Sequence, residues 1–261
     1  MDQVTPKEMT EHLRVPGTYL VCGMSNSGKT VGTQKLIQLM PRRFDRIIVF
    51  SQTARMTGDW NNVTPYVYDE PNYELVAKVQ TLQEEIKARL TSEGKDPKTA
   101  LQIAFVFDDC AGVLETQERG HPMNRLVTMS RHFNISLFFL VQAMTQISPV
   151  IRKNAHYVIL TKVHGTDYDL VYTLQTHYDN KKDFITALRA NMKDYNLIAL
   201  NMDCYTPKPI MVLAGRYKLR RRGTTPGVAS DSVTSPGMLR LPEDQECGEP
   251  CPLEDVDHGY D

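Results

Sequence analysis

The sequence lacks the features that would assign it to a membrane, secreted or zinc-binding class. It has no apolar run near the roughly 18 residues that a membrane-spanning helix needs. Its first residues, Met1–Thr5, do not show the basic stretch followed by an apolar stretch of a secretory signal. The cysteines have no zinc-ligand spacing, and their odd number argues against a disulfide framework (Cys22, Cys110, Cys204, Cys247 and Cys251). We therefore expect an intracellular, soluble protein in a reducing environment, without a membrane segment.

Basic residues are almost missing from the last part of the chain. From Thr224 to Asp261 there are nine acidic residues and one basic residue, Arg240, so this segment has a net charge of −8. Because the whole chain has a net charge of −1, residues 1–223 have a net charge of +7. The same segment contains five prolines among Ser, Thr and Gly, and too little apolar surface to fold. We expect one domain, residues 1–223, followed by a disordered acidic tail, residues 224–261. A mildly basic body with an acidic tail suits a protein that handles nucleic acid.

A glycine-rich loop between a predicted strand and a predicted helix is the most informative stretch. The apolar residues Tyr19–Cys22 lead into Gly23–Thr30, which matches the P-loop pattern G-x-x-x-x-G-K-[ST]. In such a loop, backbone N–H groups and the start of the helix surround a polyphosphate, while Lys29 contacts the β- and γ-phosphates and Thr30 ligates Mg²⁺. The sequence therefore predicts a nucleoside triphosphate site made by Gly23, Met24, Ser25, Asn26, Ser27, Gly28, Lys29, Thr30 and Val31.

Predicted strands and helices alternate along the first 215 residues. Apolar runs predict strands at Tyr19–Cys22, Arg46–Ser51, Ile103–Phe107, Ile135–Val141, Tyr157–Leu160, Leu197–Leu200 and Ile210–Leu213, with a short one around Tyr66–Tyr68. Helical spacing predicts helices after the P-loop, with Val31, Leu36 and Ile37 available to face a sheet, and at Asn72–Gly94, Asn124–His132, Ile147–Asn154, 167–177 and 182–193. Residues 1–17 are expected to form a polar lead-in, and 52–71 a loop. This alternation indicates an α/β P-loop NTPase fold, with a doubly wound, mostly parallel sheet and helices on both faces.

Two adjacent acids end the predicted strand Ile103–Phe107. In P-loop enzymes a carboxylate at this place holds Mg²⁺, which assigns Asp108 to the metal. The neighbouring Asp109 can polarise the attacking water. Burying two charges on a strand is costly without a partner such as a metal ion, so packing alone explains this pair poorly.

Three further polar residues are candidates for catalysis. Gln142 ends the next predicted strand, where its side chain can sense the γ-phosphate or orient water. Arg131, just before that strand, and Arg152, in the following short helix, are placed to reach a nucleotide in a neighbouring subunit. For each arginine, an ordinary surface cation is the alternative.

The order of these motifs resembles the FtsK/HerA superfamily. The resemblance covers about residues 15–215 and rests on the P-loop, Phe107-Asp108-Asp109, Ser130-Arg131-His132, the strand ending in Gln142, and Pro149-x-Ile151-Arg152-x-Asn154. It is strongest to the viral branch, the genome-packaging ATPases of poxviruses and other large DNA viruses. It implies an ATP-driven ring, usually of six subunits, that threads double-stranded DNA into a capsid in the infected cell.

The resemblance also implies a role for each site residue. Lys29 and Thr30 contact the phosphates and Mg²⁺, Asp108 holds the metal, Asp109 acts as base and Gln142 as sensor. The family's arginine finger corresponds to Arg131, with Arg152 as second choice. The second acid is often Glu in this family and is Asp109 here. Capsid or vertex proteins are further candidate partners.

Other functions have some support in the sequence. Asp109-Cys110-Ala111-Gly112 fits D-x-x-G and Asn180-Lys181-Lys182-Asp183 fits N-K-x-D, the patterns of a GTPase. A guanine-reading N-K-x-D should close an apolar strand, whereas here it follows polar residues. A scaffold that binds nucleotide without hydrolysing it conflicts with the two acids. A cellular or plasmid DNA pump would share the chemistry of packaging.

Overall fold

The computed structural model describes residues 1–40, 44–110, 112, 122–175, 177–193, 195–202 and 210–214. All of these belong to one compact unit, Met1–Arg222. The acidic tail, residues 224–261, lies outside the described residues, so its disorder and the domain boundary before it stay predictions.

Within the described residues, nine strands form a single sheet in the order β1-β9-β8-β7-β2-β6-β5-β3-β4. Every pairing is parallel except those of β8, which runs antiparallel to β7 and β9. The strands are β1 (Asp2–Val4), β2 (Thr18–Cys22), β3 (Arg46–Phe50), β4 (Val67–Tyr68), β5 (Ile103–Asp108), β6 (Ile135–Val141), β7 (Tyr157–Leu160), β8 (Leu197–Asn201) and β9 (Ile210–Leu213). The mostly parallel sheet predicted from the sequence is confirmed.

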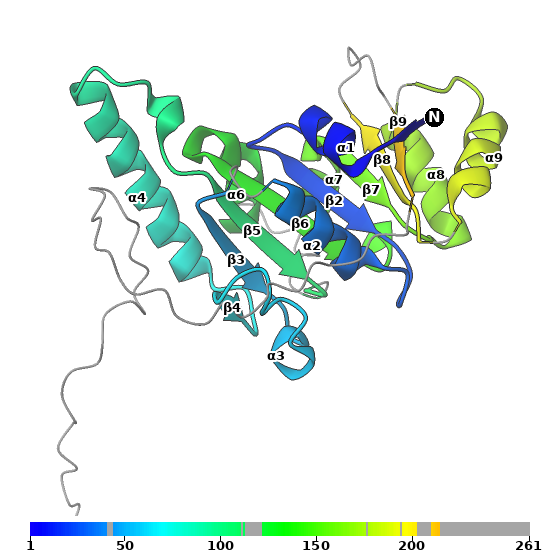
Figure 1. Cartoon of the computed structure of the whole chain (residues 1–261), viewed down its shortest axis with the longest axis horizontal. Helices are drawn as coiled ribbons and strands as arrows, with labels where there is room; N and C mark the ends of the chain where they lie inside the picture. Colours follow the sequence, from blue (N-terminus) through cyan, green and yellow to red (C-terminus); the bar gives the residue numbers. More distant parts are fainter. Residues whose placement is uncertain are drawn as a thin grey trace, which may run out of the picture. The chain divides into compact units, whose positions relative to one another are not determined.

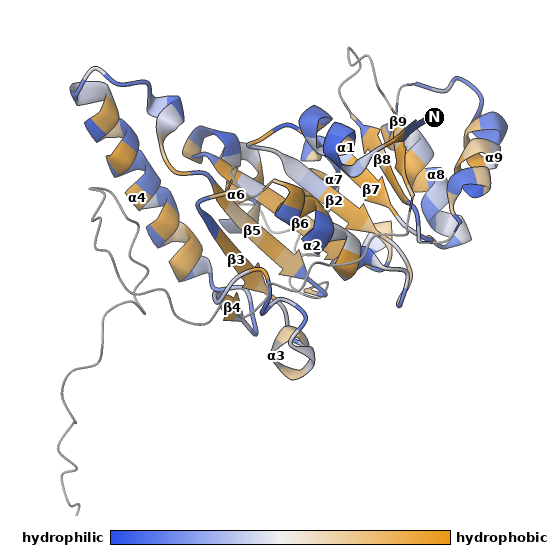
Figure 2. Cartoon of the chain, viewed as in Figure 1, coloured by the Kyte–Doolittle hydropathy of each residue, from blue (hydrophilic) through white to orange (hydrophobic). Residues whose placement is uncertain are grey.

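Helices cover the sheet on both sides, as predicted (Figure 1). The α-helices are α1 (Pro6–His12), α2 (Lys29–Leu39), α3 (Ala54–Thr57), α4 (Tyr73–Ser92), α6 (Pro122–Met129), α7 (Pro149–Asn154), α8 (Gly165–Leu174) and α9 (Lys181–Asn191). Short 3-10 helices lie at η1 (Pro97–Thr99), η2 (Ser130–Phe133) and η3 (Met144–Gln146). Figure 2 shows mostly hydrophobic strands and banded, amphipathic helices, which matches the burial of both sheet faces.

Alternating strand residues form a core beneath α1 and α2. Met9 and Leu36 pack there with Val21 of β2, Val106 of β5 and Phe138 of β6. The intervening strand residues are also buried against the other face, as Phe107 and Phe139 illustrate. This double burial explains why the strands appear in the sequence as continuous apolar runs.

The register of the parallel strands places four strand ends at one edge of the sheet. Cys22, the last residue of β2, pairs with Val141 of β6 and Leu160 of β7. Asp108, the last residue of β5, pairs with Leu140 of β6. Because β6 separates β2 from β5, the P-loop and the two acids lie on either side of the β6 end (Figure 1). We call this the carboxyl edge of the sheet.

Three expectations about local structure need correction. Residues 1–17 are not a simple lead-in, because they contain β1 and α1, and α1 starts with a capping box between Thr5 and Glu8. The loop 52–71 contains the short helix α3 as well as the expected strand β4. Val31 is 41% exposed and does not face the sheet, unlike Leu36 and Ile37.

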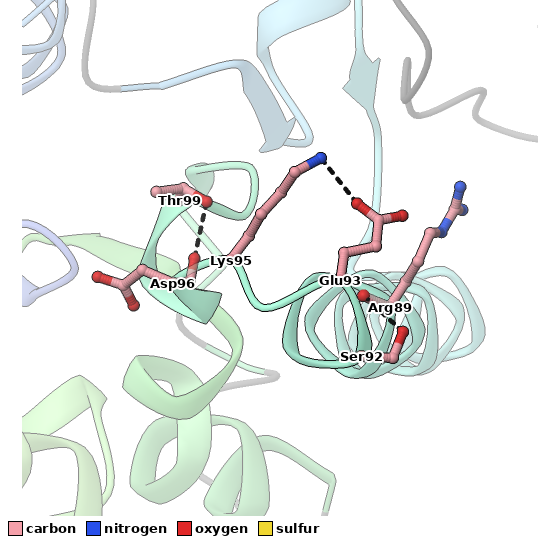
Figure 3. Close-up of polar contacts among 6 residues, drawn as sticks. All are labelled: Arg89, Ser92, Glu93, Lys95, Asp96 and Thr99. Atoms are coloured by element: carbon pink, nitrogen blue, oxygen red, sulfur yellow. Dashed lines mark hydrogen bonds and ion pairs between the residues drawn. The ribbon is translucent and has the colours of Figure 1, made fainter.

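The predicted long helix is confirmed as α4, which ends before Gly94 as the sequence indicated. Local polar contacts stabilise its end (Figure 3). Ser92 Oγ donates to the carbonyl of Arg89 at 2.8 Å, and Lys95 Nζ lies 2.7 Å from Glu93 Oε2. This part of the chain lies away from the carboxyl edge, at the far end of α4.

Candidate functional site

The P-loop connects β2 to α2 and is anchored to the neighbouring strands. Gly23 N–H donates to the carbonyl of Val141 at 3.1 Å, and Met24 N–H to the carbonyl of Lys162 at 2.6 Å. A Cβ atom at Gly23 would lie 1.8 Å from Oγ1 of Thr161, so only glycine fits this close approach. The loop is therefore held by the ends of β6 and β7.

The start of α2 is arranged for an anion. Gly28 is the N-cap residue, with φ of 88°, and supplies no side-chain cap to the first turn. The N–H groups of the first helical turn have no partner within a helix, and they attract phosphate together with the helix dipole. The first turn of α2 therefore fits the triphosphate that the P-loop pattern predicts.

Lys29 lies inside the P-loop. Its Nζ donates to the carbonyl oxygens of Gly23 at 2.7 Å and Met24 at 3.1 Å. Burial lowers the pKa of Lys29, and the negative charges of Asp108 and Asp109 oppose that shift. The ammonium group is thus held in the concave side of the loop, where a polyphosphate would meet it.

Thr30 and Asp108 form the candidate metal pair. Thr30 Oγ1 donates to Asp108, at 3.1 Å from Oδ2 and 3.5 Å from Oδ1. Asp108 is buried, and its Oδ2 also accepts a hydrogen bond from the indole Nε1 of Trp60 at 2.9 Å. Burial raises the pKa of Asp108, whereas the hydrogen bonds from Trp60 and Thr30 lower it.

This pair fits Mg²⁺ bound together with a nucleotide. Mg²⁺ is held by one or two carboxylates plus substrate phosphates, and it keeps several waters. Among the described residues, no group of three or more His, Cys, Asp or Glu could hold a metal ion by itself. One buried carboxylate beside a threonine hydroxyl at the mouth of the P-loop is the arrangement that phosphate-assisted Mg²⁺ binding requires.

Asp109 and Gln142 meet just beyond this pair. Gln142 Nε2 donates to Asp109 Oδ1 at 3.2 Å, although the two residues follow different strands. Asp109 has φ of 58°, which is uncommon for a residue other than glycine, and its side chain is exposed. The expectation that both acids lie buried on the strand is therefore wrong for Asp109, and the cost of burying charge applies to Asp108 alone.

The two candidate arginines have different surroundings. Arg152 Nη1 donates to the carbonyl oxygens of Met144 at 2.8 Å and Ile147 at 2.6 Å, so it fastens the turn between η3 and α7. Arg131 is exposed in η2, at the opposite, amino edge of the sheet. The seven-residue strand β6 separates it from the carboxyl edge by about 20 Å, at about 3.3 Å per residue.

The surroundings of Arg131 are strongly basic. It lines one cavity of about 410 Å³ together with Arg14 and Lys153, and a second of about 460 Å³ together with Arg14 and Lys98. No described Asp or Glu lines either cavity. We call these two cavities the basic cleft of the amino edge.

Sequence reasoning missed three residues around the P-loop. Thr161 follows β7 and shares a 2.7 Å hydrogen bond with Ser27. Its position at the end of a parallel strand could have indicated that it lies near the ligand site. Tyr195 lies close to Gly28, because a Cβ atom added to that glycine would be 3.3 Å from the Tyr195 ring. Tyr195 also lines a cavity of about 400 Å³ together with Asn26 and Ser27. Neither Tyr195 nor Trp60 belongs to a motif, so no pattern pointed to them.

Comparisons with known proteins address the fold and the family. A protein family described as Poxvirus A32 protein matches residues 10–201. No curated protein matches the sequence. None of the described helices is long and apolar enough to cross a membrane.

Solved structures of viral packaging proteins have a similar fold. The genome packaging NTPase B204 from Sulfolobus turreted icosahedral virus 2, in complex with sulfate, has a TM-score of 0.53 at 13% identity, over 79% of this chain and 100% of that chain. The same protein in complex with ATP-gammaS has a TM-score of 0.51 at 13% identity, over 77% of this chain and 97% of that chain. B204, the DNA-packaging ATPase from Sulfolobus turreted icosahedral virus, has a TM-score of 0.50 at 13% identity, over 77% of this chain and 98% of that chain.

At this identity the structural likeness shows the fold alone, which is that of P-loop NTPases. The family match is a separate finding and spans well over half of the sequence. The chain therefore belongs to the family described as Poxvirus A32 protein, which confirms the predicted resemblance to the poxvirus-type genome-packaging ATPases.

Proposed function

We propose that this protein hydrolyses ATP to drive double-stranded viral DNA into a capsid. The observation that carries the proposal is the hydrogen bond between Thr30 and Asp108 at the mouth of an intact P-loop. Membership of the Poxvirus A32 protein family supports the packaging role. The protein would then act in the infected host cell, with viral DNA and capsid or vertex proteins as partners.

The P-loop residues bind and orient the triphosphate. The N–H groups of the first turn of α2 contact phosphate oxygens, and Lys29 exchanges its bonds to the loop carbonyls for bonds to the β- and γ-phosphates. Thr30 and Asp108 would hold Mg²⁺, which would supply positive charge to offset the negative charge of the phosphates. These contacts fix the γ-phosphate at the carboxyl edge.

Asp109 and Gln142 act on the attacking water. Asp109 accepts the proton that the water loses as its oxygen bonds to the γ-phosphorus, while the bond between that phosphorus and the β–γ bridging oxygen breaks and ADP leaves. Gln142 keeps the Asp109 carboxylate in place through their 3.2 Å hydrogen bond and can orient the water. Because Asp109 is exposed while Asp108 is buried, the two acids are suited to different tasks.

Arg131 completes the active site of a neighbouring subunit. It lies about 20 Å from its own carboxyl edge, a distance that its side chain does not span. The basic cleft around it carries Arg14 and Lys153, which suits the approach of a triphosphate from another copy of the chain. Arg152 is occupied by two carbonyls of its own chain, which favours Arg131 as the finger. A ring of subunits, six by the family resemblance, brings each Arg131 to the next site.

A GTPase is the main alternative, and the position of its second motif argues against it. Asn180 is the N-cap of α9, where its side chain accepts a hydrogen bond from Lys182 N–H. The motif follows α8 and lies at no strand end, so Asp183 is not aimed by the sheet at a base near the P-loop. The D-x-x-G pattern lies partly outside the described residues. We therefore favour ATP as the substrate.

The test is hydrolysis of ATP and of GTP, each with and without double-stranded DNA. We expect a preference for ATP and a higher rate with DNA. Lys29→Ala is the control, because it removes the charge at the β- and γ-phosphates and should abolish nucleotide binding. Preference for GTP, or unchanged hydrolysis by Lys29→Ala, would contradict the proposal.

A further inference from the structure

Trp60 contacts the candidate metal ligand but belongs to no motif. It is the only tryptophan of the sequence, and its side chain is fully buried. It lies between α3 and β4, 48 positions before Asp108, and its indole Nε1 donates to Asp108 Oδ2 at 2.9 Å. The mechanism above does not use this contact.

The hydrogen bond distinguishes the two oxygens of Asp108. Among the described residues, Oδ2 receives both the indole N–H at 2.9 Å and the Thr30 hydroxyl at 3.1 Å, while Oδ1 has the longer 3.5 Å contact to Thr30. A threonine hydroxyl rotates to suit its surroundings, whereas an indole N–H points only in the plane of its ring. Trp60 therefore restrains the orientation of the Asp108 carboxylate through Oδ2 and leaves Oδ1 with more capacity for another partner.

Trp60 is itself held by elements of the site. Its carbonyl accepts N–H groups from Val63 at 2.9 Å and Thr64 at 3.1 Å. The carbonyl of the preceding Asp59 accepts a hydrogen bond from Gln34 of α2, the helix that begins at the P-loop. The indole also packs in the hydrophobic cluster beneath α2. The backbone bonds hold the main chain of Trp60 in place, and rotation of the ring away from Asp108 would remove the indole from its packing in this cluster.

We propose that Trp60 is a positioning residue, whose indole N–H orients the Asp108 carboxylate toward a divalent cation bound with the nucleotide. The inference rests on the proposed function, in which Asp108 and Thr30 hold Mg²⁺. Hydrogen-bond partners of metal ligands typically contribute about 10- to 100-fold in metal affinity or activity. As the only tryptophan, Trp60 also provides a fluorescence signal at the metal pair.

Trp60→Phe is the test variant, because it keeps an aromatic ring in the cluster and removes the donor. The affinity for a fluorescent ATP analogue is measured against Mg²⁺ concentration, and once without Mg²⁺. We expect the half-saturating Mg²⁺ concentration to rise about 10- to 100-fold, with metal-free nucleotide affinity unchanged. A Mg²⁺ dependence equal to that of the unaltered protein would overturn the proposal.

Thr64→Val is the matched control. Thr64 is buried in the same segment, and its hydroxyl donates to the carbonyl of Ile47 at 2.6 Å and accepts Tyr66 N–H at 3.1 Å. This variant should lower the melting temperature without changing the Mg²⁺ dependence. Equal Mg²⁺ shifts in Thr64→Val and Trp60→Phe would mean general loosening of the segment, and would also overturn the proposal.

The unaltered protein supplies a second measurement that does not depend on the folding of a variant. Adding Mg²⁺ to the protein with ATP bound should change the emission of Trp60, and no change would count against the proposal. Failure of the proposed function is recognised separately, by nucleotide binding that Lys29→Ala does not reduce. If that binding is lost in Lys29→Ala yet Trp60→Phe behaves as the unaltered protein, only the role of Trp60 is wrong.

Discussion

Replacing Asp109 with Asn should slow hydrolysis by about 10²–10⁴-fold and leave Mg²⁺ and ATP bound. The side chain is exposed and its contact is the 3.2 Å hydrogen bond from Gln142, which the amide oxygen of Asn can still accept. The free energy of unfolding should therefore change by about 0.5 kcal/mol or less. A general base contributes about 10²–10⁴ in rate. At about 1.36 kcal/mol for each factor of ten, this raises the barrier by about 2.7–5.4 kcal/mol.

The assay is phosphate release at saturating ATP and Mg²⁺, with nucleotide affinity measured against Mg²⁺ in parallel. Asp108→Asn should instead weaken Mg²⁺ binding, so that a higher Mg²⁺ concentration is needed for the same nucleotide affinity, because Asp108 and Thr30 form the candidate metal pair. Asp169→Asn is the control, since this exposed acid pairs with Lys181 of α9 at 2.9 Å and should keep the original rate. A normal rate in Asp109→Asn, or the same behaviour in Asp108→Asn and Asp109→Asn, would refute the division of roles.

Three further predictions concern the loop, its lysine and the tail. Gly23→Ala should lower the free energy of unfolding by about 1–3 kcal/mol and impair nucleotide binding, because its Cβ would lie 1.8 Å from Thr161 Oγ1. Adding Thr161→Ala to this variant should restore part of the lost melting temperature. Nucleotide affinity should decline as the pH rises, and the decline should begin below the ordinary lysine pKa of 10.5, because burial lowers the pKa of Lys29 and the neutral amine binds phosphate poorly. Calorimetry across pH, with Lys29→Arg for comparison, checks this. A chain ending at Gly223 should bind double-stranded DNA more tightly at low salt, because the tail charge of −8 competes with DNA; equal affinity at every salt concentration would contradict it.

Strands buried on both faces were predictable because their composition alone indicates them. Ile135–Val141 is apolar except for Ser136, Tyr157–Leu160 is a further run of large, mostly apolar side chains, and the predicted bounds of both equal the observed ones. The strand Asp2–Val4 was missed because it is short and polar, and it forms by pairing with β9 some 200 residues later. Helix α1 was missed although its capping box at Thr5 and Glu8 was present in the sequence.

The candidate site was predictable where a motif fixes it locally. The P-loop and Gln142 follow strands and Asp108 is the last residue of one, and parallel strand ends gather at one edge whatever the order of the strands. The burial of Asp108 but not Asp109 depends on where β5 ends, which an apolar run does not define to one residue. Trp60 reaches the site through the tertiary packing of a loop, and sequence spacing carries no information about that contact.

The most direct test of the central claim is ATP hydrolysis in mixtures of Arg131→Ala and Lys29→Ala. Arg131→Ala should bind ATP normally and hydrolyse it about 10³–10⁵ times more slowly, the range measured for arginine fingers. Lys29→Ala has an intact finger and no working P-loop. If sites are shared between subunits, mixing the two inactive proteins pairs some complete P-loops with complete fingers, and activity should reappear. Absence of activity at every mixing ratio, or full activity of Arg131→Ala as a dilute monomer, would contradict the account.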